Sequence, residues 1–328
     1  MMRRWVCGWS FLALATSSCA TSPESFAATD PHSPLVLEQI IPLAGVAGRI
    51  DHLAVDLTGH RLFVAEVANG SVDRIDLVTG KTDGRINSLK EPQGIGWLSG
   101  QKEIVVACGD GTVRFYNADT LRPTAVVVLG DDADNVRIDP RNGHVVVGYG
   151  AGGLATIDPA THRLIGRVLF KGHPEGFRLS GSRALINVPD DGAILSVDLD
   201  QGKVLARWST GAHRLNFPLA VAPGGSWFTV GYRLPAALAR IDAHTGQVLA
   251  MQSTCGDTDD LFLEGDRTLV VCGAGHVDVV RGDKTKARVE TGTGARTGLY
   301  VPELRALFVA VPARSRPAAI WKLSLRIE

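Results

Sequence analysis

The stretch GHPEGF at residues 172–177 places His173 and Glu175 two positions apart, with one proline between them. An imidazole and a carboxyl group at this spacing could bind a metal ion, exchange protons, or form an ordinary polar loop. The flanking runs LIGRVLF and RALINV are apolar and strand-like. The pair therefore lies in a loop between two predicted strands, and its meaning depends on which other residues the fold brings beside it.

Short apolar runs recur along the chain with a period near 41 residues. Their first residues are Leu53, Ile95, Val136, Phe177, Leu219, Leu261 and Leu299. Each run is followed by a turn rich in Gly, Asn, Asp or Pro and then by further short strand-like segments. No segment keeps helical spacing of apolar residues, so few helices are expected. The pattern predicts an all-β fold, a seven-bladed β-propeller with four antiparallel strands per blade.

The two ends of the repeat pattern complement each other. The last repeat offers only three strand candidates, whereas an unassigned run, PLVLEQIIPL at 34–43, precedes the first repeat. This N-terminal run is predicted to supply the outer strand of blade 7 and so to close the ring, which removes an exposed sheet edge. Residues 34–328 are then predicted to form a single propeller domain.

One repeat resembles a known sequence family. The stretch RLFVAEVANGSVDRIDLVTGK is similar to the YVTN-type repeat of exported bacterial propellers, with a strand ending in small residues, a Gly turn, V-D-x-I-D and TGK. The resemblance extends over roughly residues 35–325 at the level of the repeat and implies the propeller fold. It implies little about function, because such propellers serve as binding modules and scaffolds.

The loops that lead into the innermost strands, here called the lead-in loops, carry most of the polar residues. Two positions before the apolar runs stand Asp51, Gln93, Asp134, Glu175, Phe217, Asp259 and Thr297. The loops after the second strands open on the same face and add Glu66, Tyr149, Asn187, Tyr232 and Arg233. The predicted ligand-binding residues at this acidic channel mouth are Arg49, Asp51, His52, Gln93, Asp134, Asn135, His173, Glu175, Asn216, Asp259, Asp260 and Arg296.

Several functions fit such a mouth. The leading hypothesis is non-catalytic binding of a small molecule, a metal complex or a protein partner. The alternative is a metal-assisted hydrolase of lactone type, or a lyase, in which Asp134, Glu175 and Asp259 hold a divalent cation, Ca²⁺ or Mg²⁺, and His52 or His173 moves protons. For any single aspartate a structural role in a tight turn competes with both hypotheses.

A third reading is an interaction scaffold that uses the blade rims. Trp208 and Trp321 are expected on outer strands, where they would be exposed candidates for such contacts. A monomer is expected.

Five cysteines divide between the N-terminus and the repeats. Cys255 and Cys272 fall in the lead-in loop and second strand of blade 6, on the same predicted face, which favours a disulfide between them. Cys108 is expected to be free. A copper or zinc site using Cys272 with a lead-in histidine is the alternative.

The N-terminus has the layout of a secretory signal, with Arg3 and Arg4 before a short apolar segment. Residues 1–27 are predicted to be removed near Ala27, and residues 28–33 to form a linker; a lipoprotein signal ending at Cys19 is the alternative. The apolar segment is too short to span a bilayer, so no transmembrane segment is expected. A periplasmic or secreted location follows.

The charge balance bears on possible partners. The chain has 34 Lys and Arg residues and 34 Asp and Glu residues, without a basic run. Nucleic acid is therefore not an expected partner.

Overall fold

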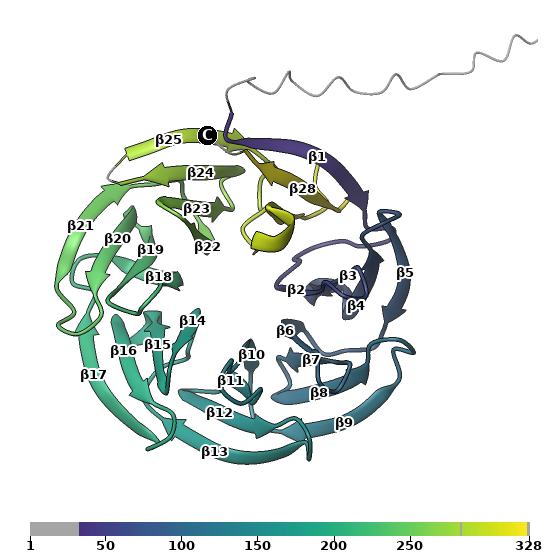
Figure 1. The fold of residues 1–328 in the computed structure, drawn as a ribbon, viewed down its shortest axis with the longest axis horizontal. Helices are drawn as coiled ribbons and strands as arrows, with labels where there is room; N and C mark the ends of the chain where they lie inside the picture. Colours follow the sequence, from purple (N-terminus) through teal and green to yellow (C-terminus); the bar gives the residue numbers. More distant parts are fainter. Residues whose placement is uncertain (1–32, 283, 327–328) are drawn as a thin grey trace, which may run out of the picture. The chain divides into compact units, whose positions relative to one another are not determined.

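The described residues, 33–282 and 284–326 of the computed structural model, contain 28 strands in seven four-stranded sheets arranged as a ring of blades (Figure 1). Within each sheet the neighbouring strands are antiparallel. The prediction of a seven-bladed β-propeller is confirmed. The predicted leader and all but the last residue of the predicted linker lie outside the described residues.

Each blade runs from an innermost to an outermost strand in chain order, except blade 7. Blade 1 contains β2 (Leu53–Asp56), β3 (Arg61–Glu66), β4 (Ser71–Asp76) and β5 (Lys81–Ile86). Blade 2 contains β6 (Pro92–Leu98), β7 (Glu103–Cys108), β8 (Thr112–Asn117) and β9 (Pro123–Val128). Blade 3 contains β10 (Ala133–Ile138), β11 (Val145–Tyr149), β12 (Gly153–Asp158) and β13 (Arg163–Leu169). Blade 4 contains β14 (Phe177–Ser180), β15 (Arg183–Val188), β16 (Ala193–Asp198) and β17 (Lys203–Ser209).

The remaining blades follow the same order. Blade 5 contains β18 (Arg214–Val221), β19 (Trp227–Leu234), β20 (Ala236–Asp242) and β21 (Val248–Ser253). Blade 6 contains β22 (Thr258–Glu264), β23 (Arg267–Cys272), β24 (His276–Arg281) and β25 (Lys284–Glu290). Blade 7 contains β26 (Gly298–Val301), β27 (Ala306–Val311), β28 (Ala319–Leu325) and β1 (Leu35–Pro42). Helical structure among the described residues consists of single 3-10 turns at Val67–Asn69, Pro189–Asp191 and Pro302–Leu304.

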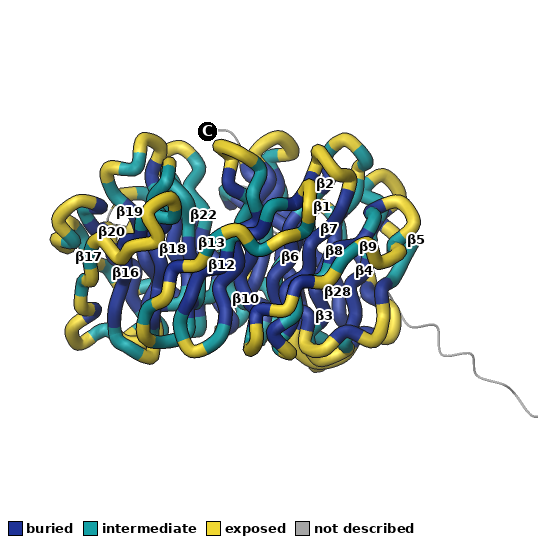
Figure 2. Tube along the Cα trace, turned by 90° about the horizontal axis from the view of Figure 1, so that it is seen from below, coloured by how far each residue is buried: buried dark blue, intermediate teal, exposed yellow. Residues whose placement is uncertain are grey.

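The hydrophobic core lies between neighbouring blades. The second strands are buried almost throughout, and Figure 2 shows buried strands inside exposed loops at both edges of the ring. Phe63 of blade 1 is fully buried and stacks on Trp97 of blade 2, with the ring centroids 6.3 Å apart. Burying one such side chain stabilises the fold by about 1.5–3 kcal/mol, so the contacts between blades hold the ring together.

The N-terminal strand closes the ring. β1 pairs antiparallel with β28 from Leu35 opposite Leu325 to Pro42 opposite Ala319, and the two lie side by side in Figure 1. The apolar residues Leu35 and Ile41 of β1 are fully buried. The predicted role of this segment as the outer strand of blade 7 is confirmed.

The two tryptophans expected to be exposed are not free surface residues. Trp321 lies on the third strand of blade 7, and only 6% of it is exposed. Trp208 lies on the outer strand β17, is half-buried, and stacks on Phe228 of blade 5 with the centroids 5.9 Å apart. The outer-strand prediction is correct for Trp208 and wrong for Trp321, and both indoles pack against apolar residues of the core.

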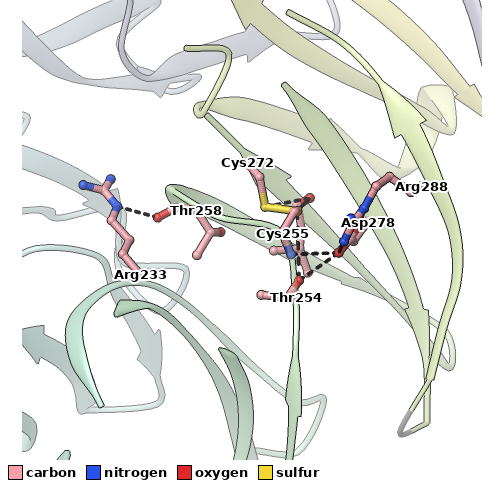
Figure 3. Close-up of a disulfide and its surroundings, with 8 residues drawn as sticks. Arg233, Thr254, Cys255, Thr258, Cys272, Asp278 and Arg288 are labelled. Atoms are coloured by element: carbon pink, nitrogen blue, oxygen red, sulfur yellow. Dashed lines mark hydrogen bonds and ion pairs between the residues drawn. A yellow bond between two sulfur atoms is a disulfide. The ribbon is translucent and has the colours of Figure 1, made fainter. Parts of the chain in front are cut away.

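A disulfide joins Cys255 to Cys272 in blade 6, with the Cα atoms 5.8 Å apart (Figure 3). The backbone nitrogen of Cys255 donates to Asp278 Oδ2 at 2.9 Å, and Arg288 Nε donates to Asp278 Oδ1 at 2.7 Å. The predicted pairing is confirmed, so Cys272 has no thiolate to offer the copper or zinc site considered as an alternative. Cys108 is free and buried, as expected.

A disulfide of this kind indicates an oxidising compartment. Within the part of the chain that the structure describes, no helix has the length and apolar character needed to cross a bilayer.

Candidate functional site

A polar cavity of about 240 Å³ opens where the lead-in loops converge, and every blade contributes to it. Its lining residues are Arg49, Asp51, His52, Gln93, Asp132, Asp134, Asn135, Arg137, His173, Glu175, Gly176, Arg178, Phe217, Pro218, Arg233, Asp259, Asp260 and Arg296. Eleven of the twelve predicted ligand-binding residues are in this set.

In blades 1 to 6 the lead-in residues reach the cavity because the pairing of the two inner strands is irregular where the chain enters the innermost strand. In blade 1, Asp51 N donates to Ala65 O at 2.8 Å and Ala65 N donates to His52 O at 3.1 Å. Asp51 and His52 on the first strand thus both lie opposite Ala65 on the second. In blade 4, Glu175 and Gly176 oppose Asn187 in the same way. The register also shifts at this point in blades 2, 3, 5 and 6. Such bulges re-aim side chains, here toward the channel.

Small residues in the lead-in loops let neighbouring blades approach closely. A Cβ on Gly94 of blade 2 would overlap the carbonyl group of Asp134 in blade 3. A Cβ on Gly176 of blade 4 would likewise overlap the carbonyl of Phe217 in blade 5, to which Gly176 N donates at 3.1 Å. The polar rim is therefore held by backbone contacts between blades.

Side-chain contacts link the rim residues of blades 1 to 4. Arg49 pairs with Asp51 and donates to Gln93 Oε1 at 2.9 Å. Gln93 Nε2 in turn donates to Asp132 Oδ1 at 3.0 Å. His173 Nδ1 lies 3.8 Å from Asp132 Oδ2 and 2.7 Å from the carbonyl oxygen of Gly150. The result is a continuous polar chain around half of the rim.

A second set of contacts covers blades 5 to 7. Arg233 Nη2 lies 2.7 Å from Asp259 Oδ1, and its guanidinium stacks 3.6 Å above the centre of the Phe217 ring. Arg233 Nε also donates to the carbonyl of Thr258 at 2.9 Å, as Figure 3 shows. Asp257 lies 3.3 Å from both Arg233 and Arg296. Arg233 is thus fixed in place by a carboxylate, a carbonyl and an aromatic ring.

His52 connects blade 1 with blade 6, which is not its neighbour in the ring. Its Nδ1 lies 3.7 Å from Asp260 Oδ2, and its Nε2 lies 3.9 Å from Asp51 Oδ1. Burial lowers the pKa of His52, but Asp51 and Asp260 outweigh burial and raise that pKa to about 9. Burial raises the pKa of Asp260, yet its hydrogen bond and charge interaction with His52 bring the pKa below its usual range. The imidazole is therefore a cation at neutral pH.

His173 and Glu175, the pair in GHPEGF, lie beside Asp134. His173 Nε2 is 3.8 Å from Asp134 Oδ2; burial lowers the pKa of His173, but Asp134 and the Gly150 carbonyl raise it to about 9. Burial raises the pKa of Glu175 to about 8, with Asp134 and Asp259 adding to the effect. Burial also raises the pKa of Asp134, but its contact with His173 holds that pKa below the usual range. At pH 7 Glu175 is mainly neutral and Asp134 charged.

The metal-binding hypothesis does not fit this arrangement of side chains. Among residues 33–282 and 284–326, no three His, Cys, Asp or Glu side chains are arranged to hold a metal ion. Asp134 faces the imidazolium of His173, and Asp259 pairs with Arg233. Burial raises the pKa of Asp259 to about 7, with Asp51 and Asp260 adding to burial and Arg233 opposing it. Two of the three carboxylates expected to hold Ca²⁺ or Mg²⁺, Asp134 and Asp259, thus already face cationic side chains.

The cavity holds more cationic groups than charged carboxylates, whereas an acidic mouth was expected. Six carboxyl groups line it together with five arginines and two histidines. The prediction overlooked Arg137 and Arg178, which stand in the middle of the apolar runs of blades 3 and 4. The corresponding residues of the other blades are Ala54, Gly96, Ala220, Phe262 and Tyr300. Arginine at this inner position was the signal that could have identified both residues.

Asn216 is the predicted residue that does not line the cavity. It is fully buried behind the rim, where its Nδ2 donates to Asn187 Oδ1 at 3.0 Å and to Ala193 O at 2.9 Å. Asn187 in turn donates to the carbonyls of Phe217 and Pro218. These two amides join blades 4 and 5 and have a structural role.

Of the second-strand loop residues, only Arg233 lines the cavity. Glu66 is fully buried against Ser71, and Tyr149 lies under the guanidinium of Arg167. Tyr232 is buried beside His213, with the ring centroids 5.2 Å apart.

No family model matches the chain, and no curated protein matches it either. Solved structures with the same fold do exist. One of them is Kuenenia stuttgartiensis hydrazine synthase, which is 15% identical to this chain and superimposes with a TM-score of 0.73. The match covers 81% of this chain and 94% of the hydrazine synthase chain. A chain of the mitotic checkpoint complex is 13% identical with a TM-score of 0.75, covering 96% and 99%.

The WD40 repeats of RRP9 are 11% identical with a TM-score of 0.75, covering 88% of this chain and 97% of that one. At these identities the likeness shows the fold alone. The chain is thus a seven-bladed β-propeller, and its function has to be argued from the cavity.

Proposed function

We propose that the protein is an exported, monomeric β-propeller that binds a small polar molecule at the channel mouth without catalysing a reaction. The observation that carries the proposal is that all seven blades place residues around one cavity lined mainly by charged, amide and imidazole groups. A propeller offers a rigid ring for such a site, because each side chain is fixed by the packing of its own blade.

Comparison with an aspartate in an outer turn supports a binding role for the cavity. Asp242 accepts hydrogen bonds from the backbone of His244 and Thr245 at 2.9 and 2.8 Å, which is the ordinary structural use of such a residue. Asp134, by contrast, is buried and lines the cavity, and its Oδ1 has no hydrogen-bond partner. A buried acceptor in this state costs stability unless a ligand or water satisfies it.

The size of the cavity favours a small ligand over a protein segment. Its volume of about 240 Å³ lies just below the range of roughly 300–1,000 Å³ that is usual for drug-sized ligands. The lining is mainly polar, so recognition would depend on hydrogen bonds and charge more than on apolar contact. Export is supported by the signal-like N-terminus and by the disulfide.

The proposal is tested by thermal denaturation of the purified protein against a panel of small polar compounds: amino acids, hydroxy acids, sugars and sugar phosphates. At least one compound should raise the melting temperature in a saturable manner, and Asp134→Asn with Glu175→Gln should remove the effect while the protein stays folded. Asp242→Asn, in the outer turn, is the matched control and should respond like the wild type. A panel without any saturable response, or an unchanged response in the cavity variant, would contradict the proposal.

A further inference from the structure

Two of the five cavity arginines have no carboxylate within ion-pair distance, although the charge of Asp260 acts on both. Arg49, Arg233 and Arg296 each pair with an aspartate. Within the described parts of the chain, no Asp or Glu oxygen lies within 4.0 Å of the nitrogens of Arg137 or Arg178. Both residues are half-buried and line the cavity. A guanidinium that is withdrawn from water normally faces a carboxylate or another anion.

The two guanidiniums are neighbours. Arg137 Nε and Arg178 Nη1 each donate to the same carbonyl oxygen, that of Phe177, at 3.0 Å. Burial, and after it the charge of Arg178, lower the pKa of Arg137, and the opposing charges of Asp260 and Asp134 do not cancel this effect. Two like charges in one cavity repel each other, and a bound anion would remove this repulsion.

Most of their donor capacity is unused. Arg137 otherwise donates to Val136 O at 2.6 Å and to Asn135 Oδ1 at 3.2 Å, both neutral acceptors. Arg178 donates through Nη1 alone among the described contacts, although a guanidinium carries five N–H groups. The pair therefore still has donors available, in the planar arrangement that suits the oxygens of a carboxylate or phosphate.

The same wall of the cavity holds an acceptor without a partner. Asp134 lies on β10 together with Arg137, only 7% of it is exposed, and its Oδ1 accepts no hydrogen bond. Unused donors and an unused acceptor thus occur on one strand. A ligand that satisfies both must combine an anionic group with a hydroxyl or amino group.

We propose that Arg137 and Arg178 bind the oxyanion of the ligand, a carboxylate or a phosphate, and that Asp134 accepts a hydrogen bond from a hydroxyl or amino group of the same molecule. This inference rests on the small-molecule function proposed above and specifies its ligand class. Hydroxy acids, amino acids and sugar phosphates all meet the requirement.

The test uses three probes at constant ionic strength: glycolate, acetate and glycerol 3-phosphate. Their binding is measured by calorimetric titration and by the shift in melting temperature. Glycolate or glycerol 3-phosphate should bind saturably to the wild type, and acetate more weakly than glycolate. Whichever of glycolate and glycerol 3-phosphate binds more tightly shows whether the natural oxyanion is a carboxylate or a phosphate. Arg178→Gln should weaken binding at least tenfold, and Arg178→Lys should give an intermediate loss because it keeps the charge but not the planar donors.

A control variant separates this pair from general electrostatics. Arg240→Gln removes an arginine outside the cavity, one that stacks on Trp227. It should keep the affinity within about threefold of the wild type. In Asp134→Ala, which has no side-chain acceptor, the preference for glycolate over acetate should disappear.

The outcomes also separate this inference from the proposed function. If none of the three probes binds saturably, or if Arg178→Gln binds them like the wild type, the oxyanion site is wrong. Should a different compound of the panel then bind and be lost in Asp134→Asn with Glu175→Gln, the channel-mouth function stands without the arginine pair. If no compound binds at all, both proposals fail.

Discussion

At the scale of single residues, the cavity is controlled by how burial and charge act against each other on each side chain. Burial alone would neutralise His52 and His173, yet the adjacent carboxylates keep both protonated. The same burial leaves Glu175, which faces Asp134 and Asp259, mainly neutral at pH 7. Identical chemical groups therefore carry different charges within one small space, as separate environments dictate.

These shifts predict a stability that falls in alkaline solution. The pKa of His52 and of His173 rises from an ordinary 6.5 to about 9 on folding, so the native state holds protons that the unfolded chain releases. This stabilisation is complete below pH 6.5 and is lost as the pH rises through 9. Urea unfolding at pH 6 and pH 9 should show a loss on the order of 1–3 kcal/mol, smaller in His52→Gln.

The raised pKa values of Glu175, about 8, and Asp259, about 7, act in the same direction, since their protons also bind more tightly in the folded state. His244→Gln is the matched control, because His244 is exposed in an outer turn. An identical pH dependence in His52→Gln and His244→Gln would disprove the charge assignment at His52.

A second residue-scale prediction concerns the Arg233–Asp259 ion pair. Arg233→Gln leaves the largely buried Asp259 without its cation, and should lower the free energy of unfolding by on the order of 1–3 kcal/mol at pH 8. Adding Asp259→Asn should recover most of the loss, because the unpaired charge is then gone. Chemical denaturation of the two single variants and the double variant measures the coupling. Additive effects would show that the pair is not coupled.

At the scale of the elements, the lead-in loops depend on glycine to bring blades together. Gly94→Ala places a methyl group against the carbonyl of Asp134, which must move, so the variant should lose about 1–3 kcal/mol of stability and part of its ligand affinity. Gly100→Ala is the control, because a Cβ there meets open space. Equal melting temperatures for the two variants would show that this contact tolerates a side chain.

The disulfide of blade 6 makes a further prediction at this scale. Cys255 and Cys272 are 17 residues apart, and closing a loop of that length stabilises a fold by about 3 kcal/mol in the chain-entropy model. A reducing agent should therefore lower the melting temperature of the wild type and leave that of the Cys255→Ser/Cys272→Ser variant unchanged. A response of the double variant would instead point to Cys108, the remaining cysteine of the described residues.

At the scale of the whole molecule, the sequence repeat made the fold predictable. It made only part of the cavity lining predictable. Seven equivalent apolar runs and the unassigned N-terminal segment were sufficient to predict the blades and the closing strand, because every blade obeys the same local pattern. Most of the rim followed from aligning the repeats.

Asn216 was misplaced because its position shortly before an apolar run did not reveal that its amide points toward Asn187. Arg137 and Arg178 were missed because they interrupt runs that otherwise indicate burial. Charge pairing across the channel, such as His52 with Asp260, depends on three-dimensional distances that no alignment of repeats contains.

Ring closure gives the prediction that belongs to this scale. A chain beginning at residue 43 lacks β1, which leaves the edge of β28 unpaired and the buried partners of Leu35 and Ile41 exposed. It should unfold at a lower temperature with lower cooperativity and aggregate, whereas a chain beginning at residue 33 should behave like the full-length protein. Calorimetry and light scattering measure both, and similar behaviour of the two truncated chains would show that β1 is dispensable.

The pairing of β1 with β28 also dictates when folding can be completed. Leu35 is one of the first described residues to be synthesised, and its partner Leu325 is one of the last. Blades 1 to 6 draw all their strands from consecutive sequence and can each form as the chain emerges, but blade 7 cannot. The first strand must wait, unpaired, until β28 has been synthesised, so the ring can close only after the strands of all the other blades have emerged.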